Sequence, residues 1–209
     1  STLVRVGNEE YARDNRHYGL TTLRTRHVRA RGAEMRFVFR GKGGIDHTVG
    51  ITDRRLASVV RRCQELPGQR LLQYLDGDGA VHALGSGDVN DYLRETCGAD
   101  VTAKDFRTWA GTVLAAWALQ ELGEYASHTQ AKRQVVAAVE SVARDLGNTP
   151  AVCRRCYVHP QVISGHLDGA LLANLGQRAE ETLAESLDEL SGREAAVLAF
   201  LRRRLAEAA

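Results

Sequence analysis

Three short segments of the sequence carry side chains that could act together on a phosphodiester. The first is Lys104-Asp105-Phe106-Arg107, in which Lys104 and Arg107 are three residues apart and share one face of a helix. Phe106 and Trp109 flank Arg107, so we expect its guanidinium to be partly buried and to need an anionic partner. That partner is either an internal carboxylate or a phosphate, whose oxygens match the planar guanidinium fork.

The other two segments add an acid and a nucleophile. Gly41-Lys42-Gly43-Gly44 places Lys42 between glycines, as a plain exposed turn residue or as a mobile proton donor. This segment lacks the G-x-x-x-x-G-K-[ST] spacing of a nucleotide-binding loop. Tyr157 follows Arg154 and Arg155 in a short polar stretch and, considered alone, would be an ordinary surface tyrosine. Phosphodiester cleavage requires a nucleophile, an acid for the leaving oxygen and positive charge around phosphorus.

We expect neither a metal nor a cofactor. The sequence contains no carboxylate cluster or histidine pair at ligand spacing, and Asp76 and Asp78 belong to a glycine-rich turn. Cys153-x-x-Cys156 would need a second ligand pair to bind zinc, and none is present. Its Arg-Arg centre also differs from a thioredoxin-like motif, so we interpret the pair as a coincidence of spacing between reduced thiols.

The charge of the chain is unevenly distributed. Residues 1–62 carry 14 Arg and Lys against 6 Asp and Glu, although the net charge of all 209 residues is only +2. A concentrated basic stretch is typical of a surface that binds nucleic acid, unless its arginines pair with acids elsewhere in the fold.

No apolar run approaches the ~20 residues of a membrane span. Leu3–Val6 has the character of the middle of an element, so we expect Ser1 to be the cut edge of a longer chain.

The elements that must position these residues are mostly helices. Between His27 and Ile51 apolar residues alternate with polar ones, interrupted at Gly32 and at 41–44, which predicts a three-stranded antiparallel meander with Lys42 at a hairpin tip. The predicted fold class is therefore α+β, mainly α with one small three-stranded sheet. Helices are predicted at 8–16, 52–64, 86–97, from 102 onward, at 130–146, around Tyr157 up to His159-Pro160, and at 191–208.

In combination and order, these segments resemble the catalytic domain of the poxvirus and bacterial type IB DNA topoisomerases. Each motif is weak alone, but together they run in the family's order and at suitable spacing. The resemblance implies that residues 1–209 form one catalytic domain, with the fold that these enzymes share with tyrosine recombinases. The motifs that carry it are Val-Arg5-Val-Gly-Asn, Tyr11, Gly-Leu-Thr-Thr-Leu at 19–23, His27-Val28, Gly41-Lys42, Lys104-x-x-Arg107 and Asn148-Thr-Pro with Tyr157.

The resemblance implies a catalytic role for each matching residue. Tyr157 is expected to attack the scissile phosphate, forming a 3′-phosphotyrosyl bond and releasing a 5′-hydroxyl. Arg5 and Arg107 would stabilise charge on the non-bridging oxygens, and Lys42 would protonate the departing 5′-oxygen. Supercoiled duplex DNA would then relax without ATP, metal or nucleotide cofactor.

The resemblance also implies how the chain binds DNA. Lys104 and Tyr11 match positions that contact DNA near the cleavage site. Asn148 stands where many relatives have a histidine that donates a hydrogen bond to a non-bridging oxygen of the phosphate. The amide of Asn148 can donate the same hydrogen bond but cannot carry positive charge. Relatives act as monomers that close a clamp around duplex DNA with a separate N-terminal domain, and we expect residues 1–209 to correspond to the catalytic half only. No membrane partner is expected, and the Ala- and Arg-rich composition favours a bacterial, cytoplasmic protein associated with the nucleoid.

Two other functions remain open from the sequence. A tyrosine recombinase shares the Arg, Lys, Arg and Tyr set, but usually has a His-x-x-Arg box where this chain has Lys104-x-x-Arg107, and a later His or Trp where it has Asn148. A non-catalytic DNA-binding module could retain the fold, although every family position for chemistry except Asn148 carries the expected residue type.

Overall fold

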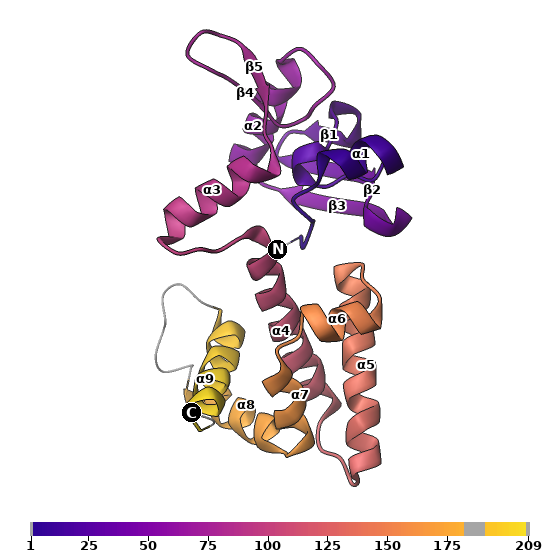
Figure 1. The fold of residues 1–209 in the computed structure, drawn as a ribbon, viewed down its shortest axis with the longest axis vertical. Coiled ribbons are helices and arrows are strands. Elements are labelled where there is room, and N and C mark those ends of the chain that lie inside the picture. The colour runs from indigo at the N-terminus through magenta and orange to yellow at the C-terminus, as the bar shows by residue number, and fades with distance from the viewer. Residues whose placement is uncertain (1, 182–190, 208–209) are drawn as a thin grey trace. The chain divides into compact units, whose positions relative to one another are not determined.

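In the computed structural model, which describes residues 2–181 and 191–207, the chain forms two units, residues 1–103 and 104–209. The five described strands and the first three α-helices belong to the first unit (Figure 1). The described elements of the second unit are all helices. None of the helices in these residues is long and apolar enough to cross a membrane.

The sheet of the first unit is the predicted meander. Its strands are β1 (Val28–Arg31), β2 (Glu34–Arg40) and β3 (Asp46–Thr52), all antiparallel and in the order β1-β2-β3. Phe37 pairs with Val28 on one side and with Val49 on the other, so apolar residues line up across one face. Lys42 begins a short 3₁₀ turn, η3 (Lys42–Gly44), between β2 and β3, as expected.

One face of the sheet is covered and the other is open. Along β2 the alternate residues Met35, Phe37 and Phe39 are buried, which is the period of two that a half-buried strand requires. They share a core with Ala12 of α1 (Glu9–Asn15) and with residues of α2 (Arg54–Glu65), which the side chain of Asp53 caps. Arg36 and Val38, which lie between them, are exposed to solvent.

The rest of the first unit holds a second, smaller sheet that the sequence did not predict. Strands β4 (Gln73–Leu75) and β5 (Val81–Ala83) pair antiparallel around the predicted turn at 76–79. Each is three residues long with no buried side chain, so neither shows the alternation from which a strand is recognised. Helix α3 (Ser86–Cys97) has the predicted bounds, and Gly98 ends it in the left-handed conformation, with φ 62°.

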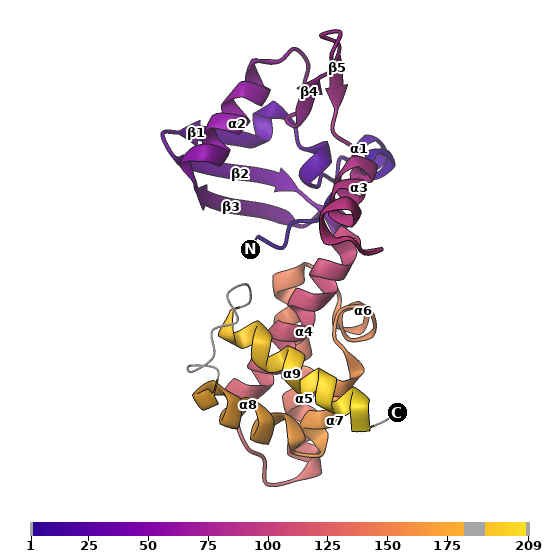
Figure 2. The same ribbon diagram turned by 90° about the vertical axis from the view of Figure 1, so that its left-hand side faces the viewer.

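Six helices make up the described part of the second unit. Helix α5 packs against α6 and α7, and α8 packs against α7 and α9 (Figure 2). Ala115 and Ala116 on α4 are buried in this unit. The elements are α4 (Ala103–Leu122), α5 (His128–Leu146), α6 (Pro150–Cys156), α7 (Pro160–Leu167), α8 (Ala170–Glu181) and α9 (Gly192–Glu207).

The region after Tyr157 contains helices that the sequence did not predict. We expected His159-Pro160 only to end a helix around Tyr157, but α6 ends at Cys156 and Pro160 begins α7. Proline is favoured in the first turn of a helix, where its missing N–H is not needed. The imidazole Nδ1 of His159 accepts the Gln161 N–H at 3.2 Å and caps the new helix. Helix α8 was also missed, whereas α9 lies within the range predicted at 191–208.

Candidate active site

Helix α4 holds Arg107 in a buried position. Its side chain is only 9% exposed, and the guanidinium donates a hydrogen bond to the main-chain oxygen of Leu146, the last residue of α5. The last carbonyls of a helix lack intrahelical partners and carry partial negative charge, so this end of α5 suits a guanidinium. This partner is a polarised main-chain carbonyl, whereas the sequence analysis expected a carboxylate or a phosphate. Lys104, one turn earlier, is exposed.

The link between α5 and α6 fixes the main chain of Asn148. Gly147 ends α5 in the left-handed conformation, with φ 57°, and its N–H donates to the Arg144 oxygen at 3.0 Å. The Asn148 N–H donates to the Ala143 oxygen at 2.8 Å, which completes the two hydrogen bonds of a Schellman motif. Thr149 then caps α6, with Pro150 in its first turn. Asn148 therefore lies, half-buried, between two helix ends.

Tyr157 lies directly after α6 and against Arg107. The Tyr157 N–H donates to the Cys153 oxygen at 2.9 Å. The centre of the Tyr157 ring is 5.6 Å from Cζ of Arg107, within the range of a cation–π contact. The ring is half-buried, so the candidate nucleophile is accessible while its main chain is fixed. Two residues far apart in the sequence are thus brought together by α4 and α6.

Two residues of α4 that the sequence analysis did not single out support Tyr157. Gly111 leaves room for the main chain of Tyr157, because a Cβ on residue 111 would lie 2.6 Å from the main-chain oxygen of Tyr157. The buried Thr112 hydroxyl donates to that oxygen at 3.4 Å and accepts the His159 N–H at 3.1 Å. The sequence carried no signal for either residue, because Thr112 lies five positions after Arg107, outside the three- or four-residue spacing that places side chains on one helix face.

The first unit holds the other predicted residues. The main-chain oxygen of Arg5 accepts the Leu20 N–H at 2.8 Å, and Gly19 fits only without a side chain, because a Cβ would lie 2.6 Å from that oxygen. Lys42 and Tyr11 are both exposed, and Nζ of Lys42 lies 5.3 Å from the centre of the Tyr11 ring. Within each unit, therefore, predicted residues come together: Tyr11 with Lys42, and Arg107 with Tyr157.

Comparison with known proteins identifies the family. The family model described as the catalytic core of eukaryotic DNA topoisomerase I matches residues 1–169. The chain belongs to the type IB DNA topoisomerases. It is similar to a protein of Acanthamoeba polyphaga mimivirus named DNA topoisomerase 1B, with 33% identity over 164 residues. That match covers 74% of this chain and 48% of the relative, so the chain spans about half the relative's length. The family and fold class expected from the motifs are confirmed.

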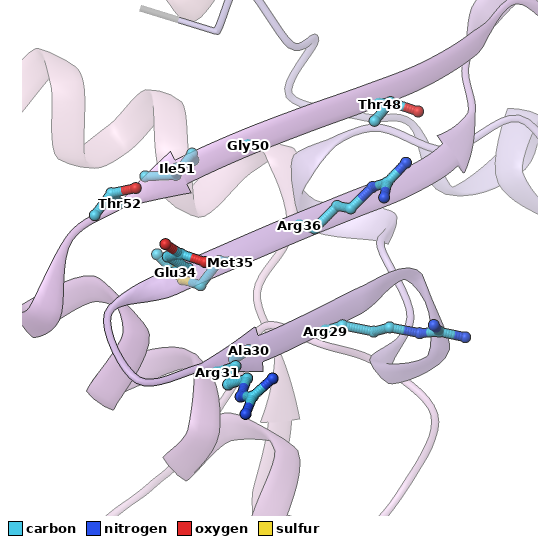
Figure 3. Close-up of a pocket in the computed structure, with 10 residues that line it drawn as sticks. All are labelled: Arg29, Ala30, Arg31, Glu34, Met35, Arg36, Thr48, Gly50, Ile51 and Thr52. Atoms are coloured by element: carbon cyan, nitrogen blue, oxygen red, sulfur yellow. The ribbon is translucent and has the colours of Figure 1, made fainter.

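The open face of the sheet carries a basic groove. Arg29 and Arg31 of β1 and Arg36 of β2 line it, together with residues of β3 such as Thr48 (Figure 3). Arg29 pairs directly with Arg36 across the strands. Within the part of the chain that the structure describes, no hydrogen bond or ion pair engages these three guanidinium groups. The groove therefore carries a net positive charge, because its lining includes three arginines and one carboxylate, that of Glu34.

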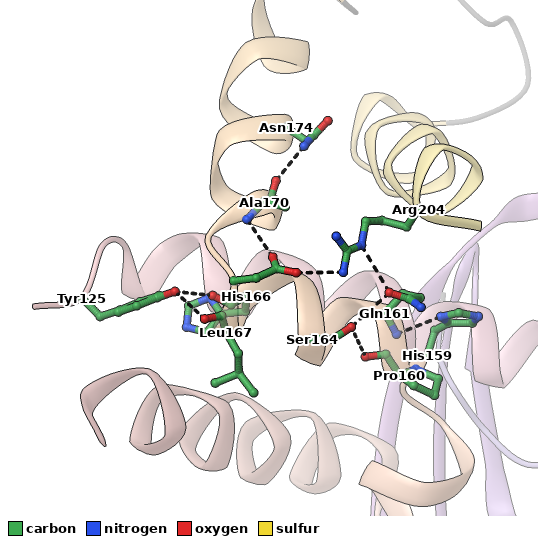
Figure 4. A network of polar contacts seen from close by, with 11 residues as sticks. Tyr125, His159, Pro160, Gln161, Ser164, His166, Leu167, Ala170, Asn174 and Arg204 are labelled. Carbon is green, nitrogen blue, oxygen red and sulfur yellow. Dashed lines mark hydrogen bonds and ion pairs between the residues drawn. The ribbon is translucent and has the colours of Figure 1, made fainter. Parts of the chain in front are cut away.

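A polar network anchors the helix that follows Tyr157 (Figure 4). The carboxylate of Asp168, just after α7, accepts from Arg204 of α9 at 2.8 Å and from the Ala170 N–H at 3.0 Å. The fully buried His166 places Nε2 3.0 Å from the Gln134 side-chain oxygen, and burial lowers the pKa of its imidazole. These contacts hold the topoisomerase chain on the far side of Tyr157, as α6 does on the near side.

Among residues 2–181 and 191–207, no three His, Cys, Asp or Glu side chains gather closely enough to hold a metal ion. The groups that surround Tyr157 are the Arg107 guanidinium, the Thr112 hydroxyl and the main chain of α6.

Proposed function

We propose that this chain relaxes supercoiled DNA by cutting and resealing one strand through a phosphotyrosyl bond at Tyr157, without ATP or metal. The observation that carries the proposal is the buried Arg107 guanidinium beside the Tyr157 ring. A fixed positive charge next to a half-exposed phenol is the arrangement that an attack on a phosphodiester requires. The name of the mimivirus relative, DNA topoisomerase 1B, supports the same activity.

In the proposed reaction one ester replaces another. The Tyr157 phenol oxygen attacks phosphorus and gives its proton to solvent water, the bond from phosphorus to the 5′-oxygen breaks, and the DNA keeps a 3′-phosphotyrosyl end. Arg107 and Arg5 stabilise the negative charge on the non-bridging oxygens, and Asn148 donates a hydrogen bond to one of them. Lys42 protonates the departing 5′-oxygen. Because the phosphotyrosyl ester conserves the energy of the phosphodiester, the free 5′-hydroxyl reverses the step without ATP.

The binding partner in this proposal is duplex DNA. Lys104 and Tyr11, both exposed, contact DNA near the scissile phosphate. Residues 1–209 act as one catalytic domain, in a monomer whose clamp is completed by an N-terminal domain. The match to about half of the mimivirus relative supports a longer architecture in the family. A bacterial origin and a place at the nucleoid, in the cytoplasm, are proposed from composition and substrate.

The test is plasmid relaxation. We expect the chain, incubated with supercoiled plasmid in EDTA and without ATP, to relax it and to form a protein–DNA adduct that survives denaturation. Peptide mass spectrometry is expected to map the adduct to Tyr157. DNA binding without an adduct would contradict the proposal and favour a non-catalytic module. An adduct accompanied by strand exchange between two DNA sites would favour a tyrosine recombinase.

Replacing Thr112 by valine is expected to slow cleavage. Valine keeps the branched shape of the side chain. It removes the hydroxyl that joins the main-chain oxygen of Tyr157 to the His159 N–H. A nucleophile displaced by about 1 Å loses on the order of 100-fold in rate, so we expect a loss of about 10- to 100-fold in single-turnover cleavage. Thr112→Ser keeps the hydroxyl and serves as the control. Equal rates for valine and serine at this position would contradict the positioning role.

Asn148→His is expected to make cleavage depend on pH. The amide of Asn148 donates a hydrogen bond at any ordinary pH, so the parent rate is expected to be flat through the imidazole range. A histidine would add positive charge when protonated, so the variant is expected to be faster below pH ~6.5, the ordinary pKa of imidazole, and to slow above it. Single-turnover rates from pH ~5.5 to ~8 would show the inflection. Loss of cleavage at every pH in the histidine variant would remove Asn148 from this role.

Removal of the groove arginines is expected to weaken DNA binding and its salt dependence. Each phosphate contact contributes about 0.9 to the slope of log affinity against log salt, so the triple substitution Arg29→Ala, Arg31→Ala, Arg36→Ala should reduce that slope by up to about 3. The matched control replaces Arg13, Arg94 and Arg203, whose charges already pair with carboxylates. Equal slopes for the two triple variants would show that the groove does not contact DNA.

A further inference from the structure

We propose that Cys153 and Cys156 form a reversible disulfide that displaces Tyr157 and switches off strand cleavage. Both cysteines lie in the last turn of α6, immediately before the candidate nucleophile, and both are free thiols in the structure. The formation of the bond depends only on these two residues. Its effect on cleavage rests on the proposed function, and the experiment below separates the two.

The spacing of the two cysteines allows the bond. Residues three apart in an α-helix have Cα atoms about 5 Å apart, within the range of about 4.4 to 6.8 Å that disulfides span. Their Cβ atoms are about 5 to 6 Å apart in a regular helix, whereas a disulfide needs about 3.5 to 4.5 Å. Closing the bond therefore tightens this turn by about 1 to 2 Å. Because α6 ends at Cys156, the strain falls on the helix end and on Tyr157.

The tightened turn is the one that fixes the nucleophile. The Cys153 oxygen accepts the Tyr157 N–H at 2.9 Å, and the Cys156 oxygen accepts the Thr108 hydroxyl at 3.5 Å. The Cys153 side chain is fully buried, and the Arg107 charge lies close enough to act on its thiol. Movement of this turn therefore changes the position of Tyr157 relative to Arg107, on which the proposed chemistry depends.

The two thiols differ in their exposure to solvent, and this difference sets the order of the oxidation steps. Cys156 is partly exposed and follows the exposed Arg154 and Arg155, a positive setting of the kind in which reactive cysteines occur. Hydrogen peroxide oxidises this thiol to a sulfenic acid and is reduced to water. The Cys153 sulfur then attacks the Cys156 sulfur, and hydroxide leaves with the thiol proton as a second water. Burial raises the pKa of the Cys153 thiol, which protects it from direct oxidation.

A dithiol reductant reverses the bond by thiol–disulfide exchange. The remaining cysteines provide matched controls, because Cys63 lies in α2 and the exposed Cys97 ends α3, both outside the unit that holds Tyr157. Their oxidation leaves the turn before Tyr157 unchanged.

The experiment uses the full chain and hydrogen peroxide. After graded oxidation and quenching, peptide mass spectrometry is expected to show a link between Cys153 and Cys156, and adduct formation on a cleavable duplex is expected to fall at least tenfold. Dithiothreitol should restore it. Cys156→Ser should remain active in peroxide, while Cys63→Ser and Cys97→Ser respond as the parent does.

Three outcomes would overturn the proposal. One is the absence of the linked peptide at peroxide levels that oxidise Cys97. Another is a linked protein that cleaves DNA as fast as the reduced one. The third is an equal loss of cleavage in Cys156→Ser. A chain that is inactive even when reduced would instead count against the proposed function, while the mass measurement would still test the bond itself.

Discussion

Tyr157→Phe is expected to abolish plasmid relaxation and adduct formation while the fold and DNA binding persist. The substitution removes only the phenol oxygen. The ring that contacts Arg107 remains, as do the main-chain hydrogen bonds to Cys153 and Thr112. Removal of a covalent nucleophile leaves no alternative route to the intermediate, so cleavage should fall by about 10⁴-fold or more. Electrophoresis after denaturation measures the adduct, and gel shift measures binding.

A second tyrosine serves as the matched control for this loss. Tyr125, in the same unit, donates its hydroxyl to the main chain of His166 and Leu167 rather than to any reacting group. Tyr125→Phe should therefore lower stability by about 1 kcal/mol without blocking cleavage. An adduct formed by the Tyr157→Phe protein, mapped to another residue, would reject Tyr157 as the nucleophile.

Arg107→Ala is expected to have the second largest effect. Loss of a preorganised donor to a developing oxyanion costs about 10²- to 10³-fold in rate. Single-turnover cleavage at saturating DNA measures this loss separately from binding. The alanine variant should also lose about 1 to 3 kcal/mol of stability, since the Leu146 oxygen loses a buried partner. Thermal unfolding would report that change.

Arg107→Lys separates charge from geometry. Lysine keeps the positive charge but lacks the planar fork that reaches a helix carbonyl and a phosphate together. Its cleavage rate should therefore lie between those of the parent and of Arg107→Ala. Arg133→Ala, an exposed arginine on α5, is the control for a change in net charge. Cleavage by Arg107→Ala at the parent rate would show that Arg107 serves the fold alone.

Local patterns in the sequence determined most of the elements. The alternation from β1 to β3 and the glycines between the strands specify the meander and put Lys42 at its turn, because the period of two is a property of neighbouring residues. Asp53 before α2 and Gly147 after α5 mark helix ends in the same local way. Where local signals were short or ambiguous, as at β4, β5 and Pro160, sequence prediction failed.

The sequence also determined the candidate residues, through the order of their motifs, but not their neighbours. Whether Arg107 would meet a carboxylate or another group could not be decided from α4 alone. The Leu146 oxygen that it contacts, and the Tyr157 ring beside it, come from segments remote in the chain. Such contacts depend on how helices pack, which no periodicity within one helix specifies.

Tertiary structure alone gave Gly111 and Thr112 their role beneath Tyr157, since a glycine and a threonine in an apolar helix have many uses. It also showed that the turn with Cys153 and Cys156 accepts the main-chain hydrogen bond of Tyr157, the proposed nucleophile. The sequence thus determined the groups to which we assign the proposed chemistry. The packing of α4 against the chain around α6 decided which of them stand side by side, because only a folded chain brings remote residues within a few ångströms.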